Sequence, residues 1–361
     1  MIIPHIIKLP PNRVWRTYKG GKTLDELEGR AVAVDSHFPE DWIASTTIAA
    51  NIGREYLINE GLTLVNINNE SILLKTLLEL FPEEILGREH FKKYGANMQF
   101  LTKYLDSALR LHIQAHPTIK FAKKYLNSNS GKTEAYVILN IREEVNEPYI
   151  YLGFQKPVTP VEFKNIIVNQ DIDKLLSYFE KIHVKKGDVF IVPGGLPHAI
   201  GRGIFMIEIM EPTDFVVRLE FERGGYVLPE EARFIGHDVD FAVNMIDFNS
   251  YSVDNIKQNY FCTPIKSILK NGGEEYILIN NKQTPCFSVH KLIVSKSFTK
   301  NSNSFYVGIT TKGSGVVSSG NQREHIKAGD RFFIPYQTGE VEYTAEEELE
   351  IVLTFPPEPV F

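Results

Sequence analysis

The chain has few features of a secreted or membrane protein. Its 361 residues include two cysteines, Cys262 and Cys286, and the 23 residues between them match no zinc or redox motif. Such scarcity is typical of a protein from a reducing compartment, although one disulfide between the two thiols stays open. The N-terminus, Met1–His5, lacks the basic segment and apolar stretch of a signal peptide. No apolar run approaches the ~20 residues that span a bilayer, so we expect a cytoplasmic protein.

The sequence also lacks blocks of lysine and arginine. Its net charge is −6, and its composition, with 43% hydrophobic and 23% charged residues, is that of an ordinary folded protein. An acidic chain without a basic patch does not favour a polyanion, so we expect neither a nucleic-acid partner nor a membrane partner. A small phosphorylated ligand is still compatible, because it requires only one or two local cations. The sequence does not reveal the oligomeric state.

The length exceeds what one hydrophobic core usually organises, so we expect two domains. Residues 53–110 show helix-like spacing of apolar side chains, as in Leu73–Leu80. From residue 111 onward, short β-type runs such as Ala135–Leu139 and Phe205–Ile209 are separated by turn residues, which is typical of a sandwich or barrel. A boundary near residues 250–260 would divide the chain.

An internal repeat supports two similar units. The segment Gly187–Pro193 (GDVFIVP) recurs as Gly329–Pro335 (GDRFFIP), 142 residues later. Each copy is a Gly-Asp turn that leads into a four-residue strand ending at proline. Two such copies predict two tandem barrels that pack closely, because no Gly/Ser-rich linker separates them.

Two segments contain candidate metal ligands. In an extended strand alternate residues share a face, so within Leu111–Pro117 the side chains of His112, Gln114 and His116 are expected to project to one side. The first repeat copy continues to His198 with the spacing Gly, five residues, Pro, one residue, Gly, two residues, His. This spacing is that of the second cupin motif, in which a glycine-rich turn delivers the histidine to the barrel interior. Imidazoles, an amide oxygen and a carboxylate together predict an open zinc site.

The order of the motifs along the chain is more specific than any one of them. The segments are Phe100–Asp106, Ile113–Pro117, Gly131–Glu134, Val192–Ile200 and Asp214–Arg218. This ordered set resembles the type I mannose-6-phosphate isomerases, particularly their compact bacterial form, and it covers most of residues 98–223.

The resemblance implies a reaction and a set of site residues. Four positions fall on the family's zinc ligands, with one Zn²⁺ per chain: Gln114, His116, Glu134 and His198. Three fall on its catalytic positions: Lys132, Asp214 and Arg218. Substrate contacts are implied for His112, Arg110, Glu40 and Trp42. The implied reaction interconverts mannose 6-phosphate and fructose 6-phosphate, so the expected partner is a small sugar phosphate.

The chain departs from the family pattern near the substrate. His112 stands where the family usually has Ser, and Ala44–Thr46 follows Trp42 where a small residue and His are common. The segment Val14–Gly21 also differs from the family's Pro-Trp-Gly type. These changes spare the metal ligands and leave the exact sugar open.

The implied chemistry moves a proton between C1 and C2 of the sugar through an enediol(ate), with a metal ion polarising the oxygens. Arg218 and Lys132 are expected to stabilise the developing negative charge or to hold the phosphate. Lys132, with a pKa lowered by burial, and Asp214 are both candidates for the base. The sequence does not choose between them.

Three other functions compete with this interpretation. A non-catalytic sugar-binding cupin would keep the ligands but lose Lys132, Asp214 or Arg218, all of which are present. An iron-dependent cupin oxygenase favours histidine-rich ligation, against which Gln114 argues. An isomerase of a different sugar is the serious rival, because of the departures at His112 and Thr46.

We therefore predict a mainly β chain with two tandem cupin barrels of the double-stranded β-helix type. Residues 1–255 form the catalytic unit, including an inserted helical segment at about residues 53–110, and residues 256–361 form a degenerate second unit. In the second repeat copy Gln337 and Glu340 replace the glycine and the histidine of the cupin motif, so this unit is expected to hold no metal.

Overall fold

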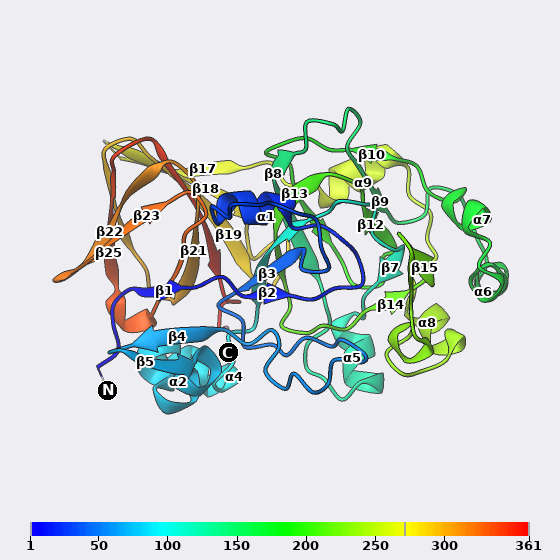
Figure 1. Ribbon diagram of the computed structural model, residues 1–361, viewed down its shortest axis with the longest axis horizontal. Helices are drawn as coiled ribbons and strands as arrows, with labels where there is room; N and C mark the ends of the chain where they lie inside the picture. The colour runs from blue at the N-terminus through cyan, green and yellow to red at the C-terminus, as the bar shows by residue number, and fades with distance from the viewer. Residues whose placement is uncertain (1, 271, 360–361) are drawn as a thin grey trace.

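Antiparallel sheets stacked face to face make up most of the molecule, as the computed structural model shows for residues 2–270 and 272–359 (Figure 1). The prediction of a mainly β chain is confirmed. The sheets are open at their edges, and the described residues contain no closed barrel. The tandem barrels therefore stay a prediction.

Two sheets belong to the first two thirds of the chain. The six-stranded sheet has the order β11-β8-β13-β6-β3-β2 and the five-stranded sheet the order β10-β9-β12-β7-β14. The strands of the first are β2 (Arg13–Val14), β3 (Glu40–Ile43), β6 (Leu101–Asp106), β8 (Glu134–Ile141), β11 (Val189–Val192) and β13 (Ile204–Met210). Those of the second are β7 (Gln114–Ala115), β9 (Tyr149–Leu152), β10 (Ile182–His183), β12 (His198–Ile200) and β14 (Val217–Arg218).

Two further sheets are built almost entirely from the last third. The seven-stranded sheet has the order β1-β24-β21-β26-β19-β18-β17 and the four-stranded sheet the order β20-β25-β22-β23. The strands of the first are β1 (Ile7–Leu9), β17 (Ile265–Lys270), β18 (Gly273–Ile279), β19 (Ser288–Val294), β21 (Tyr306–Lys312), β24 (Arg331–Ile334) and β26 (Leu349–Phe355). Those of the second are β20 (Ser297–Asn301), β22 (Ser314–Ser319), β23 (Gln322–Lys327) and β25 (Glu340–Ala345).

These four sheets form consecutive layers. One face of the six-stranded sheet packs on the five-stranded sheet through Leu105 and Leu152 among others. Its other face packs on the seven-stranded sheet through Ile207 and Val289. The far face of the seven-stranded sheet then packs on the four-stranded sheet, where Tyr343 is fully buried. The two larger sheets are therefore buried on both faces.

Alternation along a strand sorts the side chains between these layers. On β13, Ile207 and Ile209 point toward the seven-stranded sheet, whereas Met206 and Glu208 point toward the five-stranded sheet. The period of two follows from the pleat of an extended backbone. Strand β8 alternates in the same way, so one strand contributes to an apolar interface on one face and to a polar interior on the other.

The two repeat copies form the same local structure. Gly187 and Gly329 have φ angles of 90° and 93°, and each donates its N–H to the preceding paired strand, to Ile138 and Thr310 respectively. The aspartate that follows each glycine accepts the N–H of a lysine three residues before it, at 2.9 Å in both copies. Strands β11 and β24 follow these turns, which shows that the repeat in the sequence is a repeat in structure.

Short helices and two small hairpins cover the ends of the sheets. The helices are α1 (Lys22–Leu27), α2 (Leu74–Leu80), α3 (Pro82–Leu86), α4 (Arg88–Tyr94), α5 (Ile119–Tyr125), α6 (Pro160–Asn169), α7 (Ile172–Leu176), α8 (Val239–Met245) and α9 (Val253–Tyr260). The hairpins pair β4 (Leu64–Ile67) with β5 (Glu70–Leu73) and β15 (Glu222–Arg223) with β16 (Tyr226–Val227). Among the described residues, none of the helices combines the length and the apolar character needed to cross a membrane.

The helical segment predicted at about residues 53–110 is too long. Helices occupy only Leu74–Tyr94 within it, and β6 (Leu101–Asp106) is a strand in the middle of the six-stranded sheet. Every residue of β6 is buried. A strand buried on both faces shows no alternation of apolar and polar residues, so its apolar positions imitate the spacing of a helix.

The N-terminal strand β1 lies in the seven-stranded sheet, whose other strands come from the last third of the chain. Strand β1 pairs with β24, with Ile7 opposite Phe333, so this part of the predicted unit 1–255 is built into the seven-stranded sheet. The remainder of the division at residue 255 stays a prediction. Cys262 and Cys286 are both free thiols, so the alternative of a disulfide is not realised.

A buried cluster of Glu275, His290 and Lys300 in the last third of the chain leads us to expect pH-dependent stability. The Oε1 atom of Glu275 lies 2.6 Å from both His290 Nδ1 and Lys300 Nζ. Burial by itself raises the pKa of Glu275, but the hydrogen bond from His290 and the charge of Lys300 outweigh it and lower this pKa to about 2. A carboxyl whose folded pKa is depressed stabilises the fold above its unfolded pKa and loses this contribution as the pH falls toward its folded pKa.

We expect Glu275→Gln to lower the free energy of unfolding at pH 7 by about 1–3 kcal/mol, because it removes a charged acceptor and leaves Lys300 poorly paired. The difference from the wild type should shrink between pH 4.5 and pH 2, where the wild-type carboxyl takes up its proton. Urea unfolding followed by circular dichroism at several pH values measures both. Glu274→Gln, on the solvent side of the same strand, is the control and should change stability less. A difference that is equal at pH 7 and pH 3 would contradict the assignment.

Candidate metal centre and active site

Three potential metal ligands converge between the six-stranded and five-stranded sheets. One ligand atom from each of His116, Glu134 and His198 lies within 4.8 Å of the others. Glu134 begins β8 and His198 begins β12, so these two come from facing sheets, while His116 follows β7 directly. None of the three is more than 2% exposed. The sequence predicted these residues as ligands, and the fold brings them together.

Glycine allows the turn before His198 to lie against the segment that carries His116. A Cβ atom on Gly194 would lie 2.6 Å from the Pro117 carbonyl oxygen, closer than side chains approach. Gly195 has a φ of 91°, a backbone region that favours glycine, and donates its N–H to the His116 carbonyl oxygen over 2.7 Å. The close approach of these two segments explains why the turn carries two glycines before His198.

Both imidazoles are held with one nitrogen facing the site. Nδ1 of His116 lies 2.8 Å from the Phe215 carbonyl oxygen, and Nδ1 of His198 lies 2.9 Å from that of Leu196. Because a carbonyl only accepts, Nδ1 must carry the proton in each ring, and in the neutral ring Nε2 then has a lone pair. Such second contacts fix the tautomer of histidines that bind metals.

The chemistry of the donor atoms fits a cation. His116 Nε2 has no hydrogen-bond donor among the described residues, yet it lies 3.0 Å from Glu134 Oε1. Burial lowers the pKa of His116 to about 3, so the ring is neutral at pH 7. Burial also raises the pKa of Glu134, but its charged neighbours, Lys132 among them, hold it well below its ordinary value. A neutral imidazole and a carboxylate in contact are two acceptors, which repel each other unless a positive ion lies between them.

Gln114 completes the set. It is the direct partner of His198 across β7 and β12, and its amide Nε2 lies 3.4 Å from His198 Nε2. The nitrogen and oxygen of a side-chain amide are interchangeable by a half-turn of the amide. The other orientation therefore presents the amide oxygen at the same place, beside the two imidazoles and the carboxylate.

Buried charges surround this centre. Lys132 Nζ lies 3.2 Å from Glu134 Oε1, and the Tyr136 hydroxyl donates to Glu134 Oε2 over 2.5 Å. Behind them, Lys103 Nζ lies 3.1 Å from Glu208 and 3.3 Å from Glu40. The cavity next to the centre is lined by residues from both sheets and their connections, among them Arg16, Tyr18, Glu40, Lys103, His112, Gln114, Lys132, Glu134, Glu208 and Arg218.

Two of the predicted catalytic residues, Asp214 and Arg218, differ in their ion-pair partners. Asp214 forms a bidentate ion pair with Arg16, at 2.9 Å for both contacts, and accepts the N–H of Ala50 over 2.8 Å. Burial raises the pKa of Asp214, but the Arg16 guanidinium lowers it far below its ordinary value. Arg218 lies opposite Gln114 on β14 and has no ion-pair partner among the described residues. Asp214 is therefore a fixed counter-ion of Arg16 rather than a partner of Arg218.

The predicted substrate contacts fall into two groups. His112 and Glu40 line the cavity. Arg110 instead forms a bidentate ion pair with Glu220, with both contacts at 2.6 Å. The fully buried Trp42 donates its Nε1–H to Glu40 over 2.7 Å. Arg110 and Trp42 thus lie one layer behind the cavity, where they hold other groups in position.

The sequence analysis missed Lys103, Glu208, Arg16 and Tyr18, all of which line the cavity. Lys103 and Glu208 are direct partners on β6 and β13. Burial and the nearby Glu134 raise the pKa of Glu208 to about 8, so its carboxyl is protonated at pH 7. The sequence does contain a signal for Lys103 and Glu208. Each is a charged residue inside an otherwise largely apolar run, and charged residues are rarely buried without a partner or a function.

Facing sheets that enclose a cluster of buried nitrogen and oxygen donors form a β-sandwich with a candidate metal site. Comparison with known families is more specific. Residues 279–356 match the family model described as the mannose-6-phosphate isomerase cupin domain. A probable mannose-6-phosphate isomerase of Bacillus subtilis is 27% identical over 296 residues, which are 81% of this chain and 85% of the relative. The mannose-6-phosphate isomerase of Streptococcus mutans is 27% identical over 74% of this chain and 79% of its own length.

Solved structures show the same fold over nearly the whole chain. The crystal structure of the mannose 6-phosphate isomerase from Bacillus subtilis has a TM-score of 0.75 at 20% identity and covers 97% of this chain and 99% of that one. A zinc-bound mannose 6-phosphate isomerase has a TM-score of 0.72 at 16% identity and covers 98% of this chain and 100% of the other. Over most of its length the chain is therefore similar to the mannose-6-phosphate isomerases, and residues 279–356 match the cupin domain of that family. The predicted family and the prediction of an isomerase are confirmed.

The small number of ligand atoms at this site predicts that the loss of His116 alone weakens metal binding. We expect His116→Ala to bring bound zinc from about one equivalent per chain to well below one, because a site of this kind depends on each of its few ligands. Metal analysis after dialysis against a weak chelator measures the stoichiometry. His183→Ala, an exposed histidine on β10, is the control and should retain the metal. Full retention by His116→Ala would exclude this residue as a ligand.

Proposed function

We propose that the chain is a zinc-dependent isomerase that interconverts mannose 6-phosphate and fructose 6-phosphate. The observation that carries the proposal is the contact between His116 Nε2 and Glu134 Oε1, two buried acceptors beside a cavity lined by Lys132 and Arg218. The names of the relatives and of the zinc-bound structure support the same reaction and the same metal. One ion per chain would be held by His116, Glu134, His198 and Gln114.

The ion, when bound, would supply Lewis acidity toward the sugar oxygens that gain charge during the reaction. The protein's own residues would orient the sugar and move the proton. Between the two predicted bases, the structure favours Lys132, because Asp214 is held by Arg16 and by the Ala50 N–H. Lys132 is buried, and its amine lies beside the ligand Glu134, where it could pass a proton between the two reacting carbons.

The buried charges favour an anionic substrate. Burial and the nearby Glu134 raise the pKa of Glu208, which reduces the negative charge at the cavity, where the other ionisable groups include four cations and three carboxylates. The cations are Arg16, Lys103, Lys132 and Arg218, and the carboxylates are Glu40, Glu134 and Asp214. Burial and the neighbouring Arg16 lower the pKa of Arg218 to about 10, so it remains charged at pH 7. A buried guanidinium with no ion-pair partner among the described residues is suited to a phosphate group.

A second candidate is an isomerase of a different sugar, and His112 supports it. Nδ1 of His112 lies 2.9 Å from the Glu220 carbonyl oxygen, whereas Nε2 is buried and has no partner in the described part of the chain. The neutral ring therefore presents a lone pair to the cavity. This lone pair accepts a hydrogen bond from a hydroxyl but repels a phosphate oxygen. On this proposal His112 contacts a sugar hydroxyl.

We also propose that the two sandwiches are diverged copies of one cupin unit, with the first catalytic. The matching turns before β11 and β24 support this division. So does the pairing of each of these strands with the corresponding long strand, β8 or β21.

The reaction is tested with protein stripped of metal and then given one equivalent of zinc. We expect fructose 6-phosphate to form from mannose 6-phosphate only after zinc is restored, in a coupled assay. Unphosphorylated mannose and other hexose phosphates, assayed in parallel, distinguish the second candidate. Stoichiometric zinc without turnover of any sugar would favour a non-catalytic binding protein and contradict the proposal.

A second experiment tests the role of Lys132. We expect Lys132→Ala to lower kcat by about 10²–10⁴-fold, the usual contribution of a positioned acid or base, while one zinc per chain is retained. Lys120→Ala, an exposed lysine on α5, should behave as wild type. A Lys132→Ala variant with an undiminished kcat would assign the proton transfer to another residue.

A further inference from the structure

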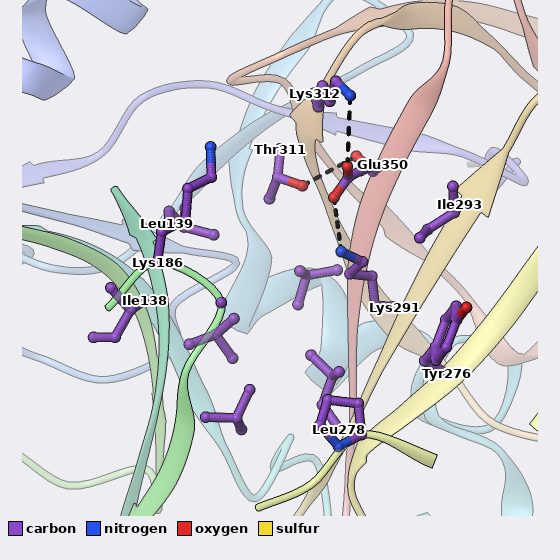
Figure 2. Close-up of a pocket in the computed structure, with 15 residues that line it drawn as sticks. Ile138, Leu139, Lys186, Tyr276, Leu278, Lys291, Ile293, Thr311, Lys312 and Glu350 are labelled. Carbon is purple, nitrogen blue, oxygen red and sulfur yellow. Dashed lines mark hydrogen bonds and ion pairs between the residues drawn. The ribbon is translucent and has the colours of Figure 1, made fainter. Parts of the chain in front are cut away.

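A second cavity lies between the six-stranded and seven-stranded sheets, away from the metal centre. Its volume is about 460 Å³. One wall consists of β8 and the start of β11, and the other of β18, β19, β21 and β26 (Figure 2). The two sheets pack closely elsewhere, as at Ile207 and Val289, which are fully buried. The cavity marks the end of the interface where they separate.

This cavity is too large to be a packing imperfection. Protein interiors contain few voids larger than a water molecule. Pockets that bind small molecules have volumes of about 300–1,000 Å³, and they occur preferentially at interfaces between domains. The cavity has that size and that place, between the units that carry the two repeat copies.

The chemistry of the lining changes from one end to the other. The deep part is apolar and includes Val189, Leu278 and Val352, each less than 5% exposed. The charged groups of Lys312 and Glu350 gather at the opposite end from Leu278, and the amine of Lys186 points toward that same end (Figure 2). A ligand that fits this gradient has an apolar body and a polar head.

The charged residues at the polar end of the cavity indicate which charge the head group of a ligand would carry. Lys291 Nζ lies 2.8 Å from Glu350 Oε2, and Lys312 Nζ lies 2.6 Å from Glu348 Oε1. Within each pair, the lysine and the glutamate neutralise each other. Lys186, exposed on the turn before β11, has no ion-pair or hydrogen-bond partner for its amine among the described residues. The Lys186 amine therefore leaves one positive charge at this end of the cavity with no anionic partner among the described residues.

We propose that this cavity binds a small amphipathic monoanion, such as a medium-chain carboxylate, with its head at Lys186 and its apolar chain between the sheets. The site goes beyond the proposed isomerase function and shares no lining residue with the metal cavity. The two cavities use opposite faces of β8. Val137 and Leu139 belong to the core that faces the seven-stranded sheet, whereas Glu134 and Tyr136 face the metal centre.

Octanoate is the probe, and octan-1-ol is its uncharged counterpart. Isothermal titration of the full chain with octanoate should give saturable binding of one molecule per chain, and octan-1-ol should bind more weakly. Lys186→Gln should weaken octanoate binding by about two- to fivefold, the effect of one exposed charge pair, and leave octan-1-ol unchanged. The matched control is Lys185→Gln, the adjacent exposed lysine whose side chain does not line the cavity.

A second variant tests the place of the apolar chain. Ile293→Trp adds a large ring from the half-buried wall strand β19, and should abolish saturable binding of both probes. Circular dichroism and bound zinc report whether this variant is folded. The absence of saturable octanoate binding to the wild type would overturn the proposal. Wild-type affinity in both the Lys186→Gln variant and a folded Ile293→Trp variant would overturn it too, because the probe would then bind elsewhere.

Discussion

The structure depends on a contact that is unfavourable by itself. Nε2 of His116 and Oε1 of Glu134 lie 3.0 Å apart, and both side chains are almost completely buried. Each imidazole is fixed by a backbone carbonyl behind it, so neither ring can turn a proton toward the carboxylate without losing that bond. In a medium of low dielectric constant a cation between the two acceptors would stabilise such an arrangement further than Lys132 does from one side. Burial, tautomer and charge therefore lead to the same conclusion about the site.

The neighbouring charges follow from that burial. Carboxylates enter a β-sandwich only if they are paired or protonated, and the cavity uses both solutions. Glu40 and Asp214 are paired with Lys103 and Arg16, whereas the raised pKa of Glu208 keeps it protonated at pH 7. This pairing also bears on the choice of a base. Asp214 already neutralises Arg16 and is therefore poorly available to accept a proton.

The proximity of His116, Glu134 and His198 and the strand repeat could be expected from the sequence, because the ordered motifs resemble a known family and the Gly-Asp turn is a local feature. Contacts between distant segments were not accessible in this way. The pairing of Asp214 with Arg16 joins residues 198 positions apart, and no local pattern in the sequence indicates it. The strand at Leu101–Asp106 was missed for a related reason, since burial on both faces comes from the tertiary structure and erases the local alternation.

The second repeat copy has no histidine at the place of His198, and the turn that follows it contacts another part of the chain. In the first copy the turn after β11 delivers His198 to the metal centre. In the second, the turn after β24 holds the N-terminal segment, with Gln337 and Thr338 donating to the carbonyl oxygens of Ile3 and His5. That segment continues through β1 and β2 to Arg16 and Tyr18 in the cavity. The sandwich without the cupin histidine thus anchors the part of the chain that carries Arg16, the counter-ion of Asp214.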